Sequence, residues 1–194
     1  MTRILLTLAV LSIVLLVAAA TIGLSIGNLY ENPSADTLHM ATVHRLTGIA
    51  AALSVVFLES VIATYFIGTS RWCKEVTETY RLDYQPVRES NQLKRRAFAV
   101  ALTGMLTVVG IIALGAAADP ATGRPNTADW TNFHLAAALA GSALIAWTYF
   151  AGWQYVGRNH AIIEGIVARV GEIRRERGLE PATIPAEPLT PAAK

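Results

Sequence analysis

The chain has 194 residues, of which 53% are hydrophobic and 15% are charged, and its net charge is +2. Ordinary soluble domains carry about a quarter charged residues, so this composition excludes that class and indicates an integral membrane protein. The small net charge, without a basic surface interleaved with aromatic residues, excludes a nucleic-acid partner. The lipid bilayer is the first partner that we expect.

Four long segments are almost free of charge, at residues 4–27, 46–70, 97–118 and 130–157, and Glu59 is the only acidic residue in them. Each reaches the roughly 20 residues that a helix needs to cross the hydrocarbon of a bilayer. The pattern predicts an all-α fold, an integral membrane four-helix bundle. Its helices are expected at about 4–28, 36–70, 95–118 and 128–157, within one domain of residues 1–157.

Basic residues are concentrated in two places. Segment 71–96 contains seven Lys and Arg residues and segment 158–177 contains five, whereas 28–43 has none and 117–133 has only Arg124. The positive-inside rule therefore predicts that both termini and segment 71–96 are cytoplasmic. We expect the protein in the inner (cytoplasmic) membrane of a bacterium.

The two ends of the chain leave alternatives open. Ala18–Ala20 resemble a signal-peptide cleavage site, but the apolar run continues to Ile26, so we favour a retained first helix. Apolar residues at helical spacing predict a cytoplasmic amphipathic helix at 158–178, lying on the membrane or on a partner. The Pro- and Ala-rich tail at 179–194 is expected to be disordered. Segment 71–96 is expected to be a solvated connector, with a short surface helix or a docking surface as the alternatives.

Two histidines carry the main functional prediction. His44 and His134 each stand at the outer start of a predicted transmembrane helix, and both helices run in the same direction. The two imidazoles should then lie at similar depth, as a bundle requires to hold one haem iron between two axial ligands. Arg45 could pair with haem propionates or, equally, with lipid phosphates.

Small residues follow each histidine at helical spacing. Gly48 lies four residues after His44, and Ala138 and Gly141 lie four and seven residues after His134. Such stripes leave room for a flat ligand, although they also allow bare helices to pack closely. We predict one haem b ligated by His44 and His134, with Arg45, Gly48, Ala138 and Gly141 around it.

Further polar and aromatic residues complete the predicted picture. Glu59 lies fifteen residues beyond His44, or about 22 Å deeper, and cannot touch the same iron. We expect it to be neutral or hydrogen-bonded to a neighbouring hydroxyl, with a role in proton or quinone chemistry as the alternative. Examples of such hydroxyls are Ser54, Ser60 and Thr103. His39 and His160 are expected to face water, and an inner aromatic belt is expected from Trp147, Tyr149, Trp153 and Tyr155.

The segment Thr42-Val-His44-Arg45-Leu-Thr47-Gly48 resembles the His-Arg-x-x-Gly segment that opens a haem-binding helix in the haem A synthase family. Residues 1–157 would resemble one four-helix half of such a protein, with Phe133–Ala136 at the start of the fourth helix. The segment is also similar to a motif of the succinate dehydrogenase cytochrome b anchor. Ala41 stands where the first family has a functional glutamate and the second a quinone-contacting serine. This difference speaks against haem A synthesis and against a copied quinone site.

The leading functional interpretation is a non-catalytic electron carrier or an accessory subunit of a respiratory or oxidase-assembly system. A membrane or cytoplasmic protein is the expected partner, and a homo-oligomer and a quinone remain open. Two axial histidines leave no open position on iron, which favours electron transfer over oxygen chemistry. The alternative is a cofactor-free membrane anchor or assembly subunit that binds a cytoplasmic partner through segment 71–96 and the C-terminal helix. A small transporter is the weakest interpretation.

Overall fold

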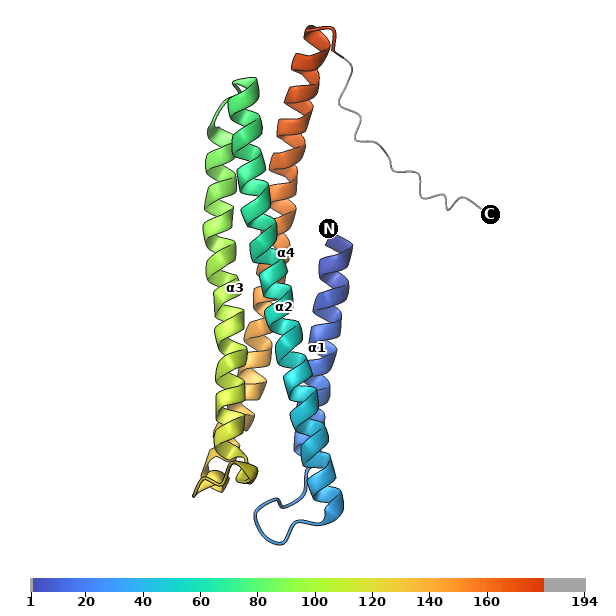
Figure 1. Cartoon of the computed structure of the whole chain (residues 1–194), viewed down its shortest axis with the longest axis vertical. Helices are drawn as coiled ribbons and strands as arrows, with labels where there is room; N and C mark the ends of the chain where they lie inside the picture. Colours follow the sequence, from blue (N-terminus) through green and yellow to red (C-terminus); the bar gives the residue numbers. More distant parts are fainter. Residues whose placement is uncertain (1, 180–194) are drawn as a thin grey trace, which may run out of the picture.

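A computed structural model describes residues 2–179, which form four long α-helices (Figure 1). The helices are α1 (Thr2–Ser25), α2 (Ala35–Tyr80), α3 (Gln85–Ala118) and α4 (Thr131–Glu176). Two short 3-10 turns, η1 (Pro120–Thr122) and η2 (Thr127–Trp130), precede α4. The expected all-α four-helix bundle is confirmed, and all four helices are long and apolar enough to cross a membrane.

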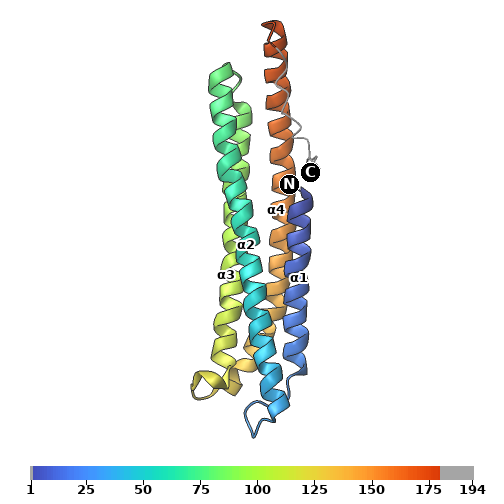
Figure 2. The ribbon, with the colours of Figure 1, turned by 45° about the vertical axis from the view of Figure 1, so that its right-hand side comes forward.

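The helices form two hairpins, α1–α2 and α3–α4, which pack against each other mainly through α2 and α3. Helices α1 and α3 barely touch, so they occupy opposite corners of the bundle. Loops 26–34 and 119–130 lie together at the end that we call the histidine end, and the α2–α3 turn lies at the far end (Figure 1). Helix α1 is the shortest, so only α2, α3 and α4 continue to the far end (Figure 2).

The structure differs from the expected helix boundaries at the far end. Helix α2 continues past residue 70 to Tyr80 and α3 already begins at Gln85, so segment 71–96 is a helical hairpin and not a connector. Helix α4 runs without a break to Glu176, so 158–176 is not a separate amphipathic helix. Of the tail predicted to be disordered, 180–194 lies outside the described residues.

A second small core explains these longer helices. Its buried residues come from all three helices that reach the far end: Cys73, Val87, Ile166 and Val170. The α2–α3 turn is closed by a hydrogen bond from the Leu82 amide to the Thr77 carbonyl (3.0 Å), with Arg81 in the left-handed region at φ 53°. This is the Schellman arrangement that commonly ends helices. We call this three-helix extension, residues 71–96 and 158–176, the stalk.

The surface of the four-helix part is as apolar as its interior. Large apolar side chains are exposed on every helix, among them Leu6, Val10, Leu53, Phe57, Leu102, Leu106, Leu139 and Phe150. A water-soluble bundle would place polar residues at such positions, and contiguous apolar surface of this extent marks contact with lipid or protein. The arrangement is compatible with an integral membrane protein.

The two hairpins share a pattern of residues about 90 positions apart. His134 follows His44 by 90 residues, and Tyr149 follows Glu59 by 90 residues; the glycines Gly115 and Gly23 are 92 residues apart. Buried core positions match in the same way, Val55 with Ile145 and Phe66 with Val156. Matching positions in the two hairpins thus hold the histidines, the glycines and part of the buried core.

Candidate functional site

His44 of α2 and His134 of α4 face each other across the bundle axis. Their ring centroids are 6.1 Å apart and the ring planes make an angle of 78°. Both side chains are half-buried. The sequence predicts that these histidines lie at the same depth. The packing of the two hairpins also brings their rings close together.

Each histidine ring lies against a glycine of the preceding helix. A Cβ atom at Gly23 would lie 2.8 Å from Cε1 of His44, and one at Gly115 would lie 2.9 Å from Cε1 of His134. Real Cβ atoms do not approach ring carbons so closely, so any larger residue at either position would displace the ring. The two glycines belong to the pattern of residues about 90 positions apart, and each makes the same kind of contact with a histidine ring.

Hydrogen bonding fixes the tautomer of His44. Its Nδ1 atom lies 2.9 Å from the Ala19 carbonyl oxygen. A carbonyl can only accept, so Nδ1 carries the proton and Nε2 of the neutral ring keeps a free lone pair. The equivalent carbonyl for His134 is that of Ile111, which lies close to the ring. The geometry there falls short of a hydrogen bond, because Nδ1 of His134 is buried with no partner among residues 2–179.

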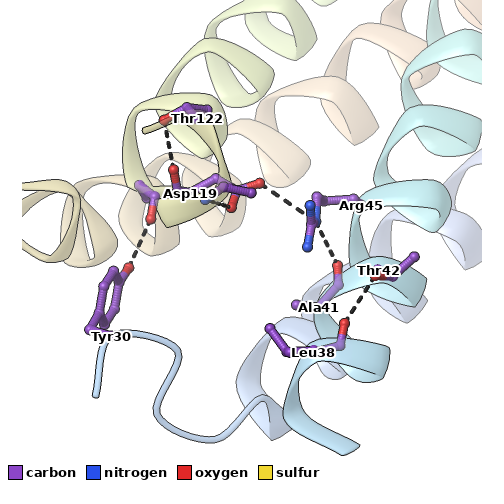
Figure 3. A network of polar contacts seen from close by, with 9 residues as sticks. Tyr30, Leu38, Ala41, Thr42, Arg45, Asp119 and Thr122 are labelled. Atoms are coloured by element: carbon purple, nitrogen blue, oxygen red, sulfur yellow. Dashed lines mark hydrogen bonds and ion pairs between the residues drawn. The ribbon is translucent and has the colours of Figure 1, made fainter. Parts of the chain in front are cut away.

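Polar contacts tie the two hairpins together at the histidine end of the bundle (Figure 3). The Tyr30 hydroxyl, from the α1–α2 loop, donates to the Ala118 carbonyl (2.8 Å) and also lies 2.8 Å from Thr131 Oγ1. Arg45 Nε donates to the Ala41 carbonyl (3.1 Å) and lies 3.5 Å from Asp119 Oδ2. The contacts of Tyr30 and the Arg45–Asp119 pair join one hairpin to the other, whereas the Arg45–Ala41 bond lies within α2.

The predicted neighbours of the histidines occupy different environments. Arg45, expected to pair with propionates or lipid phosphates, pairs with Asp119 and remains half-exposed. A Cβ atom at Gly48 would meet nothing within 4 Å, so this position is open. Ala138 is half-buried. Gly141 is buried against α3, where a Cβ atom would lie 2.6 Å from Cδ1 of Ile111, so a macrocycle at this depth would have to displace the Ile111 side chain.

The other two histidines lie outside this site. His39 is exposed and lies five residues before His44 on α2. His160 is exposed on α4, and its Nε2 lies 3.3 Å from Glu164 Oε1. Neither contributes to the His44–His134 pair, as the sequence predicts.

A second polar layer lies deeper in the bundle. Glu59 is fully buried, and the expected hydrogen bond to a neighbouring hydroxyl is formed with Thr148 Oγ1 (2.7 Å) and not with one of the examples Ser54, Ser60 and Thr103. Tyr149, expected in the aromatic belt, is buried instead, with its hydroxyl 2.6 Å from Ser12 Oγ. Ser54 Oγ donates to Ser12 Oγ (3.0 Å). Two surface grooves border α2 and the α1–α4 contact, and neither is lined by His44 or His134.

Sequence reasoning misses Gly23 and Gly115, because glycines inside apolar helices are ordinarily explained by helix packing. The available signal is their spacing, since His44 follows Gly23 by 21 residues and His134 follows Gly115 by 19.

Comparisons with family models, with curated proteins and with solved structures find no match for this chain. The resemblance to haem A synthases therefore stays a prediction from a short motif.

Proposed function

We propose that this protein is a small membrane cytochrome b in which His44 and His134 are the two axial ligands of one haem. The observation that carries the proposal is the separation of the two rings. An iron bound to both Nε2 atoms at about 2 Å would place the ring centroids about 6 Å apart. The observed separation is 6.1 Å.

The donor set favours haem over a bare metal ion. Structural zinc sites use four protein ligands, and catalytic ones use three. Within residues 2–179 no group of three or more His, Cys, Asp or Glu side chains could hold a metal ion. Two imidazoles satisfy an iron only when a macrocycle supplies the other four nitrogens.

The residues of the chain would orient the ligands and keep the site closed. The Ala19 carbonyl holds His44 with Nε2 free to bind, which is the usual outer contact of a metal-ligating histidine. Gly23 and Gly115 leave the space that the two imidazole rings occupy. A haem bound between two histidines exchanges single electrons and offers no open position to oxygen. The proposed role is therefore electron transfer, in its own right or as an accessory subunit of a respiratory or oxidase-assembly system.

The charge distribution supports an orientation for this cytochrome. Basic residues are frequent at the far end, among them Arg71, Lys74, Lys94, Arg95, Arg96 and Arg158. By the positive-inside rule the stalk and both termini are cytoplasmic, and the histidine pair lies near the outer face of a bacterial cytoplasmic membrane.

The stalk favours a second candidate function. It extends three helices beyond the N-terminal end of α1 and has a core of its own. A cofactor-free anchor or assembly subunit would use such an extension to bind a cytoplasmic partner. The two candidates differ in one property, since only the cytochrome binds haem.

The test is a dithionite-reduced minus oxidised absorbance spectrum of the purified protein in mild detergent. We expect sharp b-type bands in the wild type and their loss in His44→Ala and in His134→Ala. His39→Ala and His160→Ala are the matched controls, because both side chains are exposed and neither belongs to the pair. A wild type that stays colourless after haem supplementation would overturn the cytochrome and leave the anchor.

A further inference from the structure

A carboxylic acid is buried in the bundle far from the histidine pair. Glu59 has no exposed surface, and its Oε1 forms the hydrogen bond with Thr148. Its Oε2 is buried and has no hydrogen-bond partner among residues 2–179. Gly104 of α3 packs directly on this carboxyl, where a Cβ atom would collide with Oε1.

The surroundings of Glu59 offer no compensating charge. None of the ion pairs in the described part of the chain involves it. Around it, α1 presents Ser12, α3 presents Gly104, and α4 presents Thr148 and Tyr149, of which only Tyr149 can titrate. An ionised carboxylate buried without a partner is far more costly than a neutral acid, most of all inside a membrane.

Apolar layers separate this carboxyl from both ends of the bundle. Toward the histidine end lie Leu16, Val55, Val108 and Ile145, and toward the far end lie Ile62, Phe66 and Val156, all of them buried. The hydrogen-bonded hydroxyls of Tyr149, Ser12 and Ser54 lie in the same part of the bundle. A groove of about 460 Å³ between α1 and α4 reaches Leu58, Ile62 and Tyr149 from the lipid-facing side.

We propose that Glu59 is a proton-binding site inside the membrane part of the bundle. Its carboxylate binds one proton to give the neutral acid, and the proton exchanges with solvent protons while the fold remains intact. Thr148 has one hydroxyl proton, and its Oγ1 lies 2.7 Å both from Oε1 of Glu59 and from the Ile145 carbonyl oxygen, which can only accept. A proton on Oε1 lets the neutral acid donate to Thr148 Oγ1 while Thr148 donates to Ile145. The inference uses no haem and stands independently of the cytochrome proposal.

The deciding experiment is infrared spectroscopy of the full-length protein at neutral pH, with Glu59→Gln as the comparison. We expect a C=O stretching band of a protonated carboxyl in the wild type, its absence from Glu59→Gln, and its shift to lower frequency in D2O. Glu75→Gln is the matched control, because Glu75 is exposed and paired with Arg71. Replacing it should leave the protonated-carboxyl region unchanged.

Thr148→Val keeps the test available if Glu59→Gln fails to fold. It removes the hydrogen bond to Oε1, so the band should move and not disappear. Wild-type and Glu59→Gln spectra that coincide would mean that Glu59 is ionised, and the proposal would be overturned. A band that never shifts in D2O would equally overturn it. So would a band that appears only when choline replaces sodium, because Glu59 would then hold a cation.

Discussion

The His44 ring occupies the space that a side chain at position 23 would fill, so only glycine fits there. A Cβ atom at Gly23 would lie 2.8 Å from Cε1 of His44, and the ring donates from Nδ1 to the Ala19 carbonyl one helical turn away. The α1 backbone thus sets both the position and the tautomer of the imidazole. Gly115 stands in the same relation to His134.

Gly23→Ala and Gly115→Ala are each expected to weaken haem binding. The new methyl group would collide with the histidine ring, and overpacking of this kind costs on the order of 1–3 kcal/mol. We expect haem affinity to fall roughly tenfold or more, which corresponds to about 1.4 kcal/mol. Titration of the purified apoprotein with haem, followed by absorbance, measures the change.

Gly110→Ala is the matched control for these two variants. It lies on α3 like Gly115, but a Cβ atom there would meet nothing within 4 Å. Alanine is preferred over glycine inside a helix by roughly 1 kcal/mol, so this variant should be at least as stable as the wild type. If all three variants bind haem equally well, Gly23 and Gly115 do not position the ligands.

Arg45 and Asp119 should act on the haem potential in opposite directions. Arg45 adds a positive charge beside His44, which disfavours the more positive ferric state, so Arg45→Gln is expected to lower the midpoint potential. Asp119→Asn removes a negative charge and should raise it. The ion pair itself is partly exposed and stabilises the fold by less than about 1 kcal/mol. Changes on the order of tens of millivolts are expected at such range.

Redox titration of Arg45→Gln and Asp119→Asn tests whether their midpoint potentials shift in opposite directions. Arg124→Gln is the control, since Arg124 is exposed and makes no ion pair among residues 2–179. Shifts of the same sign in Arg45→Gln and Asp119→Asn would show that local rearrangement, not charge, controls the potential.

The number and type of helices follow from the sequence because four uncharged segments of sufficient length admit one interpretation. The helix ends at the far end do not, because a mixed-charge segment fits a solvated connector as well as a surface helix. The charges of segment 71–80 are in fact spaced for a helix, with Arg71 paired to Glu75 and Lys74 to Glu78 at four-residue intervals. That spacing was the available signal for a longer α2.

The depth of the two histidines in the bundle could be predicted from the sequence, but the direction in which each side chain points could not. Sequence position places His44 and His134 at the same level, whereas the rotation of each helix is decided by packing of side chains distant in the chain. Tyr149 illustrates the limit, because an aromatic residue between Trp147 and Trp153 suggests the lipid interface, yet it turns inward to Ser12. The 90-residue pattern is weak in the sequence because matching positions differ in type, as Glu59 and Tyr149 do.

Asn159→Ala should destabilise the bundle where the stalk begins. Asn159 is fully buried, accepts from Ser90 Oγ (2.8 Å) and donates to Thr69 Oγ1 (3.0 Å) and Tyr65 Oη (3.3 Å). Truncation leaves these hydroxyls without their partner, which costs about 1–3 kcal/mol. Thermal unfolding in detergent measures the loss, with the exposed Asn132→Ala as control. Equal midpoints for the two variants would contradict a stabilising role for this network.

Single cysteines should report the orientation of the bundle. In a Cys73→Ser background, Ala121→Cys places a thiol in the exposed turn at the histidine end and Thr79→Cys places one at the far end. The positive-inside rule predicts that a membrane-impermeant maleimide labels residue 121, and not residue 79, in right-side-out vesicles. Labelling of both after detergent is added is the control for reactivity. The reverse pattern would put the histidine pair on the cytoplasmic side.

If both proposals hold, Glu59 should make the haem potential depend on pH. Loss of its proton leaves a negative charge on the bundle axis, which favours the ferric state, so the midpoint potential falls as the pH is raised. Glu59→Gln carries no titrating proton and should give a flatter dependence. Tyr149→Phe is the control, because it removes the hydroxyl at the position equivalent to Glu59 and keeps the carboxyl. Potentials measured across the pH range by redox titration decide the matter. Identical slopes in the wild type and in Glu59→Gln would mean that the buried proton and the haem electron are independent of each other.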